Sequence, residues 1–445
     1  MTDATPDTTD TRDDAQRYRD AFASNAAAGD ALGSVRNRAF EAFEATGFPT
    51  RKHEEWRYTN PAPVTEVDWK IASPASAEFE AAGDIALPDF GGDRLVFVDG
   101  EFASELSRRN ADSPVDFTSL ADAELSALPR YAEIAEAKES GLTAFNTALA
   151  NDGAALRIRA TDEAPVPLHV VFVSTAATPE SVSFPRLWIH AEAQSRGRVI
   201  VDHVSARASD ERRHFTCAVG EVFVGASASL DLTIVQRESQ ASLHVARHCV
   251  EQERDSTLRI QTLSLGGALV RNDLEVVLAA SGSQCHLDGL FLGRDTQTVD
   301  NHTLVDHAVP HCDSHERYKG IVSGQSRGVF RGRVLVRPDA QQTNAVQQNQ
   351  NLVLTPGAEI DTKPQLEIYA DDVACSHGSS IGRLDEEALF FLRSRGLDPA
   401  FARRLLMSGF ANEITRTVSD EAVRSWVEAL IADGLDALTG QQETR

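Results

Sequence analysis

Apolar and polar residues alternate with a period of two along the middle of the chain, from Ala155 to Tyr369. Because the side chains of a β-strand point alternately to its two faces, this period predicts strands. No helical pattern interrupts the series, which excludes a βαβ arrangement and leaves a large sandwich, a propeller or a β-solenoid. The predicted strands contain LRIRA, PLHVVFVS, RVIVDHV, GEVFVG, SLDLTIV, STLRIQTLSL, DLEVVL, HLDGLFL, RVLVRP and QLEIYA.

Two features favour the solenoid. Several of these runs recur at a spacing of roughly 20 to 30 residues, which is the length that one coil of a solenoid needs. The segment AQQTNAVQQNQNLVL, residues 340–354, crowds amides into a strand-like stretch. Amides stacked inside a coil hydrogen-bond along the stack, whereas a sandwich core has little use for them. We therefore predict a mainly β fold with a parallel β-helix core over residues 154–383.

Helical patterns precede this core. From Ala15 to Thr46, apolar residues such as Tyr18 and Phe22 recur at spacings of three and four, which predicts two helices. Helical spacing returns from Leu120 to Leu149. We expect an acidic disordered tail over residues 1–14 and a helical N-terminal region over residues 15–153.

The two N-terminal helical patterns are separated by a connector and a hairpin. The connector GFPTRKHEEWRYTNP contains Pro49 and Pro61, which argue against a continuous helix. In LVFVDGEF, residues 95–102, Asp99-Gly100 suits a type I′ turn between alternating apolar residues, so we expect a small β-hairpin.

Three helices are expected after the core, in a C-terminal domain over residues 384–445. DEEALFFLRSRG begins with Asp385 at an N-cap position, and DPAFARRLLMSGFANEI begins with Asp398 as the cap before a proline. SDEAVRSWVEALIADG has apolar residues at helical spacing, with Ser419 as the expected cap and Gly434 as the expected stop.

The charge balance narrows the classes of partner. The chain of 445 residues has 67 acidic and 43 basic residues, a net charge of −24. This field repels nucleic acid and anionic membrane surfaces, so we expect neither as a partner. The lysines are few (Lys52, Lys70, Lys138, Lys319 and Lys363), and acidic residues are spread along the whole chain. We interpret this surface as an adaptation to high cytosolic salt, which screens dense like charge.

The sequence predicts a cytoplasmic protein. The N-terminal stretch MTDATPDTTDTRDD lacks the basic and apolar regions of an export signal. No stretch approaches the roughly 18 uninterrupted apolar residues of a membrane span. The five cysteines are odd in number and scattered, so reduced thiols are expected rather than a disulfide framework.

Several motifs suggest enzymatic or metal chemistry only weakly. GQSRG, residues 324–328, matches a nucleophile elbow around Ser326, but the strand-like VFRGRVLV follows where the elbow needs a helix. No P-loop or helix-opening G-x-G-x-x-G is present, so we expect no nucleotide site in this chain. A group of possible zinc ligands fits no standard zinc spacing and is more typical of hydrogen-bonded structure. Its members are His302, His307, His311, Cys312 and His315.

A second pair of donors lies in DDVACSHGSS, residues 371–380. Cys375 and His377 are two residues apart, so in an extended segment they point to one face with Cα atoms about 6.5 to 7 Å apart. A thiolate and an imidazole at this spacing can converge on one iron ion or one cluster edge. An iron–sulfur cluster normally takes four protein ligands, so a functional site here needs donors from a second chain.

Long stretches resemble the SufB/SufD family of the SUF iron–sulfur cluster assembly machinery, and among its members the SufD pattern. The resemblance covers most of the chain and is dense from Asp306 to Ile414. It rests on VDHAVP, SHERYKGI, VFRGRVLVRPDAQQTNAVQQNQNLVL, AEIDTKPQLEIYADDVACSHGSSIGRLDEEALFFLRSRGL, GFANEI and the connector KHEEWRYTN.

The resemblance implies a right-handed parallel β-helix between N-terminal and C-terminal helical regions, in a non-catalytic scaffold subunit. Such a subunit pairs with SufB through the β-helix and holds the ATPase SufC on its C-terminal domain. A transient iron–sulfur cluster is implied at the SufB interface, with His377 as a ligand and Cys375 as a second, weaker candidate. We expect the apolar residues around Phe410 and Ile414 to dock the ATPase, and a homodimer is an alternative when the chain is made alone.

Other interpretations stay open at this point. A SufB-type paralogue shares the fold, but its EHEA segment is replaced here by CSHGSS. Cys217, Cys249 and Cys285 lie in the predicted core, where a sulfur-transfer route or simple packing would both fit. A β-helix carbohydrate-active enzyme needs paired carboxylates on one exposed sheet, and the sequence shows no such arrangement.

Overall fold

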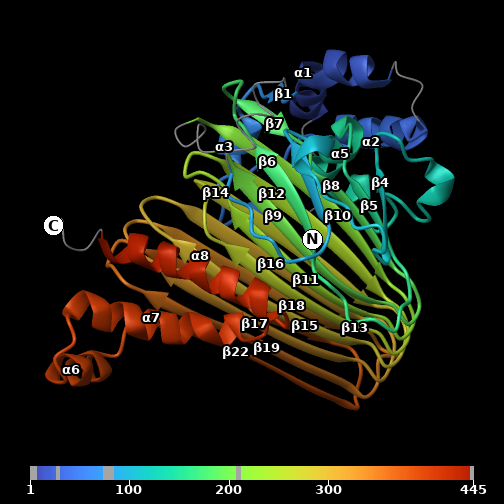
Figure 1. The fold of residues 1–445 in the computed structure, drawn as a ribbon. Helices are drawn as coiled ribbons and strands as arrows, with labels where there is room; N and C mark the ends of the chain where they lie inside the picture. Colours follow the sequence, from blue (N-terminus) through green and yellow to red (C-terminus); the bar gives the residue numbers. More distant parts are fainter. Residues whose placement is uncertain (1–7, 27–30, 74–84, 207–211, 441–445) are drawn as a thin grey trace.

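The chain folds into a parallel β-solenoid with helices at both ends (Figure 1). The computed structural model describes residues 8–26, 31–73, 85–206 and 212–440. Each coil contributes one strand to a 12-stranded sheet and one to a 10-stranded sheet, and successive coils pair in parallel. The prediction of a mainly β protein with a β-helix core and flanking helices is confirmed.

The two sheets contain the following strands. The 12-stranded sheet consists of β1 (Lys70–Ile71), β4 (Val115–Ser119), β5 (Ala154–Ile158), β7 (Ser181–Ser183), β8 (Arg186–Ala191), β10 (His214–Val224), β12 (Leu243–Gln252), β14 (Leu269–Leu278), β16 (Thr298–His307), β18 (Arg327–Val336), β20 (Glu359–Thr362) and β21 (Gln365–Ile368). The 10-stranded sheet consists of β2 (Arg94–Val98), β3 (Glu101–Phe102), β6 (Leu168–Ser174), β9 (Arg196–Ser205), β11 (Ser229–Arg237), β13 (Thr257–Ser264), β15 (Gln284–Gly293), β17 (Asp313–Val322), β19 (Thr343–Val353) and β22 (Val373–Gly382).

The coil length explains why the repeat is weak in the sequence. Side chains that hydrogen-bond across one coil are 28 residues apart for Thr233 and Gln261, and 31 residues apart for Glu316 and Gln347. The period therefore drifts along the chain instead of staying fixed. The alternation within strands is more regular, because every second side chain points into a core that includes Leu232, Ile260 and Leu287.

The hairpin predicted over residues 95–102 is confirmed as β2 and β3, which pair antiparallel. Asp99 has φ 48° and Gly100 has φ 95°, as the two central residues of a type I′ turn require. The hairpin does not stand apart from the core, because β2 also pairs in parallel with β6. It therefore extends the 10-stranded sheet at the N-terminal end of the solenoid.

Two N-terminal helices are present as predicted, α1 (Thr8–Ala26) and α2 (Gly33–Thr46). Helix α1 begins at Thr8, so residues 8–14 are helical and the predicted disordered tail was too long. The rest of that tail, residues 1–7, lies outside the described residues. These helices and α5 (Gly141–Leu149) pack on the outer face of the 12-stranded sheet, where an aromatic cluster contains Tyr18, Phe43, Phe145 and Phe215.

The helix expected over residues 120–149 is wrong except for its last nine residues, which form α5. Pro129 interrupts the pattern, and Arg130 and Ala132 have positive φ angles of 63° and 60° that a helix does not allow. The apolar residues of this stretch instead pack under β8 and β10 around Trp188. Shorter helical turns of the N-terminal region are η1 (Glu54–Trp56), α3 (Ala62–Thr65), η2 (Ser104–Leu106), η3 (Leu125–Ala127) and η4 (Ala137–Glu139).

Three C-terminal helices follow the core, α6 (Glu386–Ser394), α7 (Pro399–Thr415) and α8 (Glu421–Gly440). Asp385 and Asp398 cap the first two as predicted, each accepting two backbone N–H groups. Helices α7 and α8 pack on the outer face of the 10-stranded sheet.

The expected limits of the last helix are both wrong. Asp420, not Ser419, accepts the N–H groups of Ala422 and Val423, while Ser419 donates to Asp231. Helix α8 continues through Gly434, where an added Cβ would lie 2.6 Å from Leu292 Cδ1. This glycine therefore serves close packing on the solenoid rather than termination. None of the helices within the described residues has both the length and the apolarity needed to cross a membrane.

Candidate functional site

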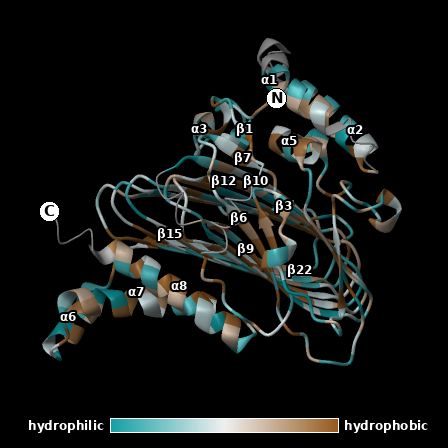
Figure 2. Cartoon of the chain, turned by 45° about the horizontal axis from the view of Figure 1, so that its top comes forward, coloured by the Kyte–Doolittle hydropathy of each residue, from teal (hydrophilic) through white to brown (hydrophobic). Residues whose placement is uncertain are grey.

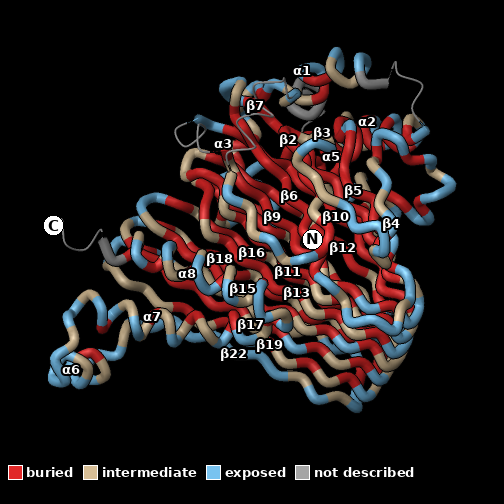
Figure 3. The backbone as a smooth tube through the Cα atoms, in the orientation of Figure 1, coloured by how far each residue is buried: buried red, intermediate tan, exposed pale blue. Residues whose placement is uncertain are grey.

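The C-terminal end of the solenoid is an open edge. Strand β22 pairs with β19 on one side, and no other strand of the described chain pairs with its second edge. Most of β22 is exposed, in contrast to the strands inside the stack (Figure 3). An unpaired edge presents free backbone donors and acceptors to another chain. Apolar side chains are exposed here too, at Ile368, Tyr369 and Ile381.

Cys375 and His377 both lie on β22, as the sequence predicted for an extended segment. Cys375 pairs in register with Ala345, and His377 pairs with Gln347. Ala345 and Gln347 are buried positions that point into the solenoid. The two donors therefore continue interior columns of side chains out to the open end, where His377 is exposed.

The two donors differ in their surroundings. Cys375 is half-buried and packs against the small apolar cluster of Val334, Val336 and Ala345. Burial raises the pKa of its thiol, more than its contact with the Ala345 backbone lowers it. In the chain alone the thiol is therefore protonated at neutral pH, and it needs a nearby positive charge or metal ion to become a thiolate ligand.

Polar side chains line the interior just behind this end. Gln347 Nε2 donates to Glu316 Oε2 at 2.6 Å, and Asn349 Nδ2 donates to the Tyr318 carbonyl oxygen at 3.2 Å. Asn351 donates to Asn349 and to the carbonyl oxygen of Ser380. The bonds of Gln347 and Asn349, and that of Asn351 to Ser380, run between neighbouring coils as predicted for this segment, whereas the bond of Asn351 to Asn349 lies within β19. Burial raises the pKa of Glu316 to about 7, although its hydrogen bonds oppose the shift.

The open end offers too few ligands to hold a cluster alone. Cys375 and His377 supply one sulfur and one nitrogen, while an iron–sulfur cluster takes four protein ligands. Over residues 8–26, 31–73, 85–206 and 212–440, no group of three or more His, Cys, Asp and Glu side chains is arranged to hold a metal ion. The geometry therefore fits half of a shared site, with its second half on whatever covers this end.

A second exposed surface lies on the C-terminal helices. Phe390, Phe391, Phe401 and Leu405 are between 45% and 73% exposed on α6 and α7. Helix α6 projects from the body of the molecule, and both helices carry brown apolar segments (Figure 2). We call these four residues the α6–α7 patch. Aromatic side chains grouped at this level of exposure are typical of an interaction site.

The residues that the sequence suggested for docking are not on this patch. Ile414 is fully buried, in the cluster that joins α7 and α8 to the solenoid. Phe410 packs on the same cluster, and its ring lies 4.2 Å from the Lys319 ammonium group. Lys319 in turn lies 2.6 Å from Glu413. The expectation for Phe410 and Ile414 was wrong because helical periodicity does not show which apolar face the core uses.

The histidine-rich segment is hydrogen-bonded structure. His307 shares a hydrogen bond of 2.8 Å with Ser314, and His315 stacks on His286 with the ring centroids 5.3 Å apart. His302 lies 3.0 Å from Asp300 on the outer face of the 12-stranded sheet. Cys312 is buried in the apolar core. These side chains point to different faces of the solenoid, so they do not converge on one ion.

The nucleophile-elbow motif does not form an elbow. Ser326 is fully buried, and its hydroxyl donates to the carbonyl oxygen of Ser323 at 2.7 Å. Strand β18 begins at the next residue, as the apolar pattern predicted. Ser326 therefore closes a turn between two coils and presents no nucleophile to solvent.

The three core cysteines serve packing. Cys217 and Cys249 face the N-terminal region, and Cys285 lies inside the solenoid. Burial raises the pKa of each thiol, for Cys249 to about 12. Arg247 lies beside Cys249 and lowers the pKa of its thiol, but burial raises that pKa by more, so the simple packing interpretation fits all three.

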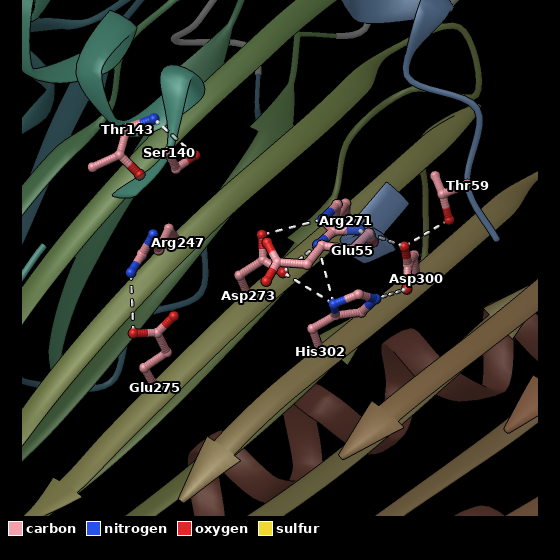
Figure 4. Close-up of polar contacts among 10 residues, drawn as sticks. All are labelled: Glu55, Thr59, Ser140, Thr143, Arg247, Arg271, Asp273, Glu275, Asp300 and His302. Atoms are coloured by element: carbon pink, nitrogen blue, oxygen red, sulfur yellow. Dashed lines mark hydrogen bonds and ion pairs between the residues drawn. The ribbon is translucent and has the colours of Figure 1, made fainter. Parts of the chain in front are cut away.

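Sequence reasoning missed an ionic network that joins the connector to the solenoid (Figure 4). Arg271 is buried on β14, donates twice to Asp273 and bonds to Asp300 at 3.0 Å. It also bonds to the Glu55 carbonyl oxygen at 2.7 Å and lies 4.2 Å from the Trp56 ring. The charged residues of HEEWR and of β14 indicate that ion pairs can form there. They do not show that Arg271 pairs with Glu55, which lies 216 residues earlier in the sequence.

Two family models together match most of the chain. The family model described as SUF system FeS cluster assembly, SufBD core domain matches residues 172–410, and the SufBD protein N-terminal region matches residues 14–170. An iron–sulfur cluster assembly SufBD family protein of Synechocystis is 33% identical over 397 residues, covering 87% of this chain and 85% of that protein.

Two relatives bear the name SufD. The iron–sulfur cluster assembly protein SufD of Escherichia coli is 31% identical over 393 residues, covering 88% of this chain and 90% of the relative. The protein of the same name from Bacillus subtilis is 25% identical over 420 residues, covering 90% of this chain and 93% of the relative.

Proposed function

The chain belongs to the SufBD family of iron–sulfur cluster assembly proteins, and from this premise we propose that it is a SufD-type scaffold subunit. In this proposal it is not itself an enzyme. It supplies one face of a site on which a nascent cluster is built, and a partner supplies the other face. The observation that carries the proposal is the open end of the solenoid, where Cys375 and His377 form an incomplete donor set on an unpaired edge.

The proposed partner at this end is SufB. The edge of β22 can continue its sheet by pairing with a strand of a second solenoid, which is β-augmentation. Ile368, Tyr369 and Ile381 would then be buried against the partner. A SufB-type ligand opposite His377 completes the coordination of iron, which is the cargo of the complex. The imidazole ligates iron in its neutral form.

The proposed partner of the α6–α7 patch is the ATPase SufC. Helix α6 follows the edge strand β22 closely in the chain, but it projects from the body of the molecule (Figure 1). Docking here would bury apolar surface, and each Å² of buried apolar surface favours binding by about 25 cal/mol. ATP hydrolysis by the docked subunit would then supply the energy for assembly.

Co-expression of the chain with the SufB and SufC proteins of the same organism tests both contacts separately. Ile381→Asp places a charge on the open end and should abolish co-purification of SufB while SufC is retained. Phe391→Asp places a charge on the α6–α7 patch and should have the opposite effect. Both residues are more than half exposed, so neither change should unfold the chain. Retention of both partners by both variants would contradict the assignment of the surfaces.

A further inference from the structure

One interior column of the 10-stranded sheet ends at the candidate ligand. Leu287, Glu316, Gln347 and His377 are paired in register on successive strands. His377 is the last, because β22 is the edge strand. Gln347 is nonetheless fully buried one strand from the open end, so the terminal strand must cover it.

The two polar atoms of the Gln347 side chain have different surroundings. Its Nε2 donates to Glu316 Oε2 at 2.6 Å. Its Oε1 is buried and meets no hydrogen-bond donor among the described residues. A buried acceptor without a donor costs about 1 to 3 kcal/mol, so a donor close to Gln347 is expected to satisfy it.

Glu316 fixes which end of the amide faces outward. Above its raised pKa of about 7, and so at the pH of the test below, the Glu316 carboxylate is only an acceptor and must meet the NH₂ group of Gln347, not the carbonyl oxygen. The oxygen is then directed away from Glu316, toward the next strand of the column. That strand lies about 4.8 Å further out and carries His377 at the paired position.

We infer that the Gln347 side-chain oxygen accepts one ring N–H of His377 and so leaves the other ring nitrogen directed out of the open end. Gln347 is then a positioning residue, and Glu316 orients it. The paired strands lie about 4.8 Å apart, so a His377 ring turned inward would bring an N–H close to the Gln347 oxygen. Histidines that ligate metal commonly donate their second N–H to an oxygen in this way, which fixes the tautomer and the ring orientation.

The hydrogen bond lies within one chain and can be tested in the isolated protein. Only its part in cluster assembly rests on the proposed function. Nitrogen NMR of histidine-labelled protein at about pH 8.5 reports the tautomer of each imidazole, and His377→Ala identifies the signal of His377 by its loss. We expect one dominant tautomer in the wild-type chain. Gln347→Met, which keeps the length without the acceptor, should give the mixture of a free imidazole.

Gln348→Met is the matched control, because Gln348 is the exposed neighbour on the same strand. It should leave the His377 signal unchanged. A mixture of His377 tautomers in the wild-type chain overturns the inference. This measurement is made on the wild-type protein, so it holds even if the variants fail to fold. A single tautomer that persists in Gln347→Met overturns it as well.

Cluster yield separates this inference from the proposed function. Loss of such an outer contact typically weakens metal binding about 10- to 100-fold. Gln347→Met should therefore lower the amount of cluster that the complex forms by a similar factor. If the tautomer changes while the yield does not, the contact stands and the proposed role of His377 in assembly fails.

Discussion

At the residue scale, the interior of the solenoid holds an acid close to the open end. Glu316 is buried beside Gln347, and burial raises its pKa to about 7 from 4.5. The folded chain holds this proton more tightly than the unfolded chain. The contribution of Glu316 to the free energy of unfolding is therefore fully present below pH 4.5 and is lost as the pH rises to about 7.

Glu316→Gln removes this dependence. At pH 8 the variant should be more stable than the wild-type chain, by up to about 3 kcal/mol, since one pKa unit corresponds to about 1.4 kcal/mol. At pH 4.5 the two should be nearly equal. Urea unfolding at the two pH values measures the difference. A wild-type chain that is as stable as the variant at pH 8 would show that the carboxylate is compensated in the folded state.

Single residues also show what the sequence could reveal about the site. Cys375 and His377 were found because two residue types of known chemistry stand two positions apart in an extended segment. Gln347 and Glu316 were not, because nothing in the sequence says that positions 31 residues apart stack in one column. The register between coils depends on loop lengths, which vary from coil to coil.

At the scale of elements, strands were predicted better than helices. Alternation follows directly from which side chains face the core, so runs such as SLDLTIV in β11 and HLDGLFL in β15 were found, whereas β12, β16 and β17 were not among the predicted strands. Helical spacing on residues 120–140 was misleading, because Pro129 and two residues with positive φ divide the segment into turns. The C-terminal helices were found, yet the prediction of which apolar residues they expose was wrong, since Ile414 is buried and Phe391 is more than half exposed.

The contact between η1 and β14 predicts a large effect of one buried charge. Arg271→Met removes the guanidinium group paired with Asp300, which is itself buried and would keep only the Thr59 hydroxyl and the His302 ring as partners. Breaking a buried pair on one side costs about 3 to 5 kcal/mol, because the other charge is left unpaired. Thermal unfolding should therefore occur at a clearly lower temperature.

Arg333→Met is the control, two strands away on β18 of the same sheet. Arg333 lies 3.8 Å from Glu367, and both side chains are more than one-third exposed. An exposed pair of this kind contributes about 0 to 1 kcal/mol. Equal destabilisation by the two variants would contradict the role assigned to Arg271.

At the scale of the whole molecule, the charge of −24 must be accommodated by the folded state. The ion pairs involve arginine far more than lysine, as in Arg237 with Asp202 and Arg337 with Asp306. Repulsion among the remaining acidic groups weakens when the Debye length falls from about 10 Å at 0.1 M salt to about 3 Å at 1 M.

Raising KCl from 0.1 M to 1 M should therefore raise the unfolding temperature of the chain. The same series in a neutral osmolyte of equal osmolality separates screening from solvent exclusion. An unfolding temperature that does not change or falls with KCl would contradict the interpretation of the surface as salt-adapted.

The solenoid as a whole leaves one end open, and the proposed cluster site needs a second chain to complete it. The measurement that tests this most directly is the amount of iron–sulfur cluster formed by the purified complex with SufB and SufC, for the wild-type chain and for His377→Ala. We expect the variant complex to assemble with unchanged stoichiometry, because His377 is exposed at the edge, and to form almost no cluster. Normal cluster yield in an intact His377→Ala complex would contradict the central claim.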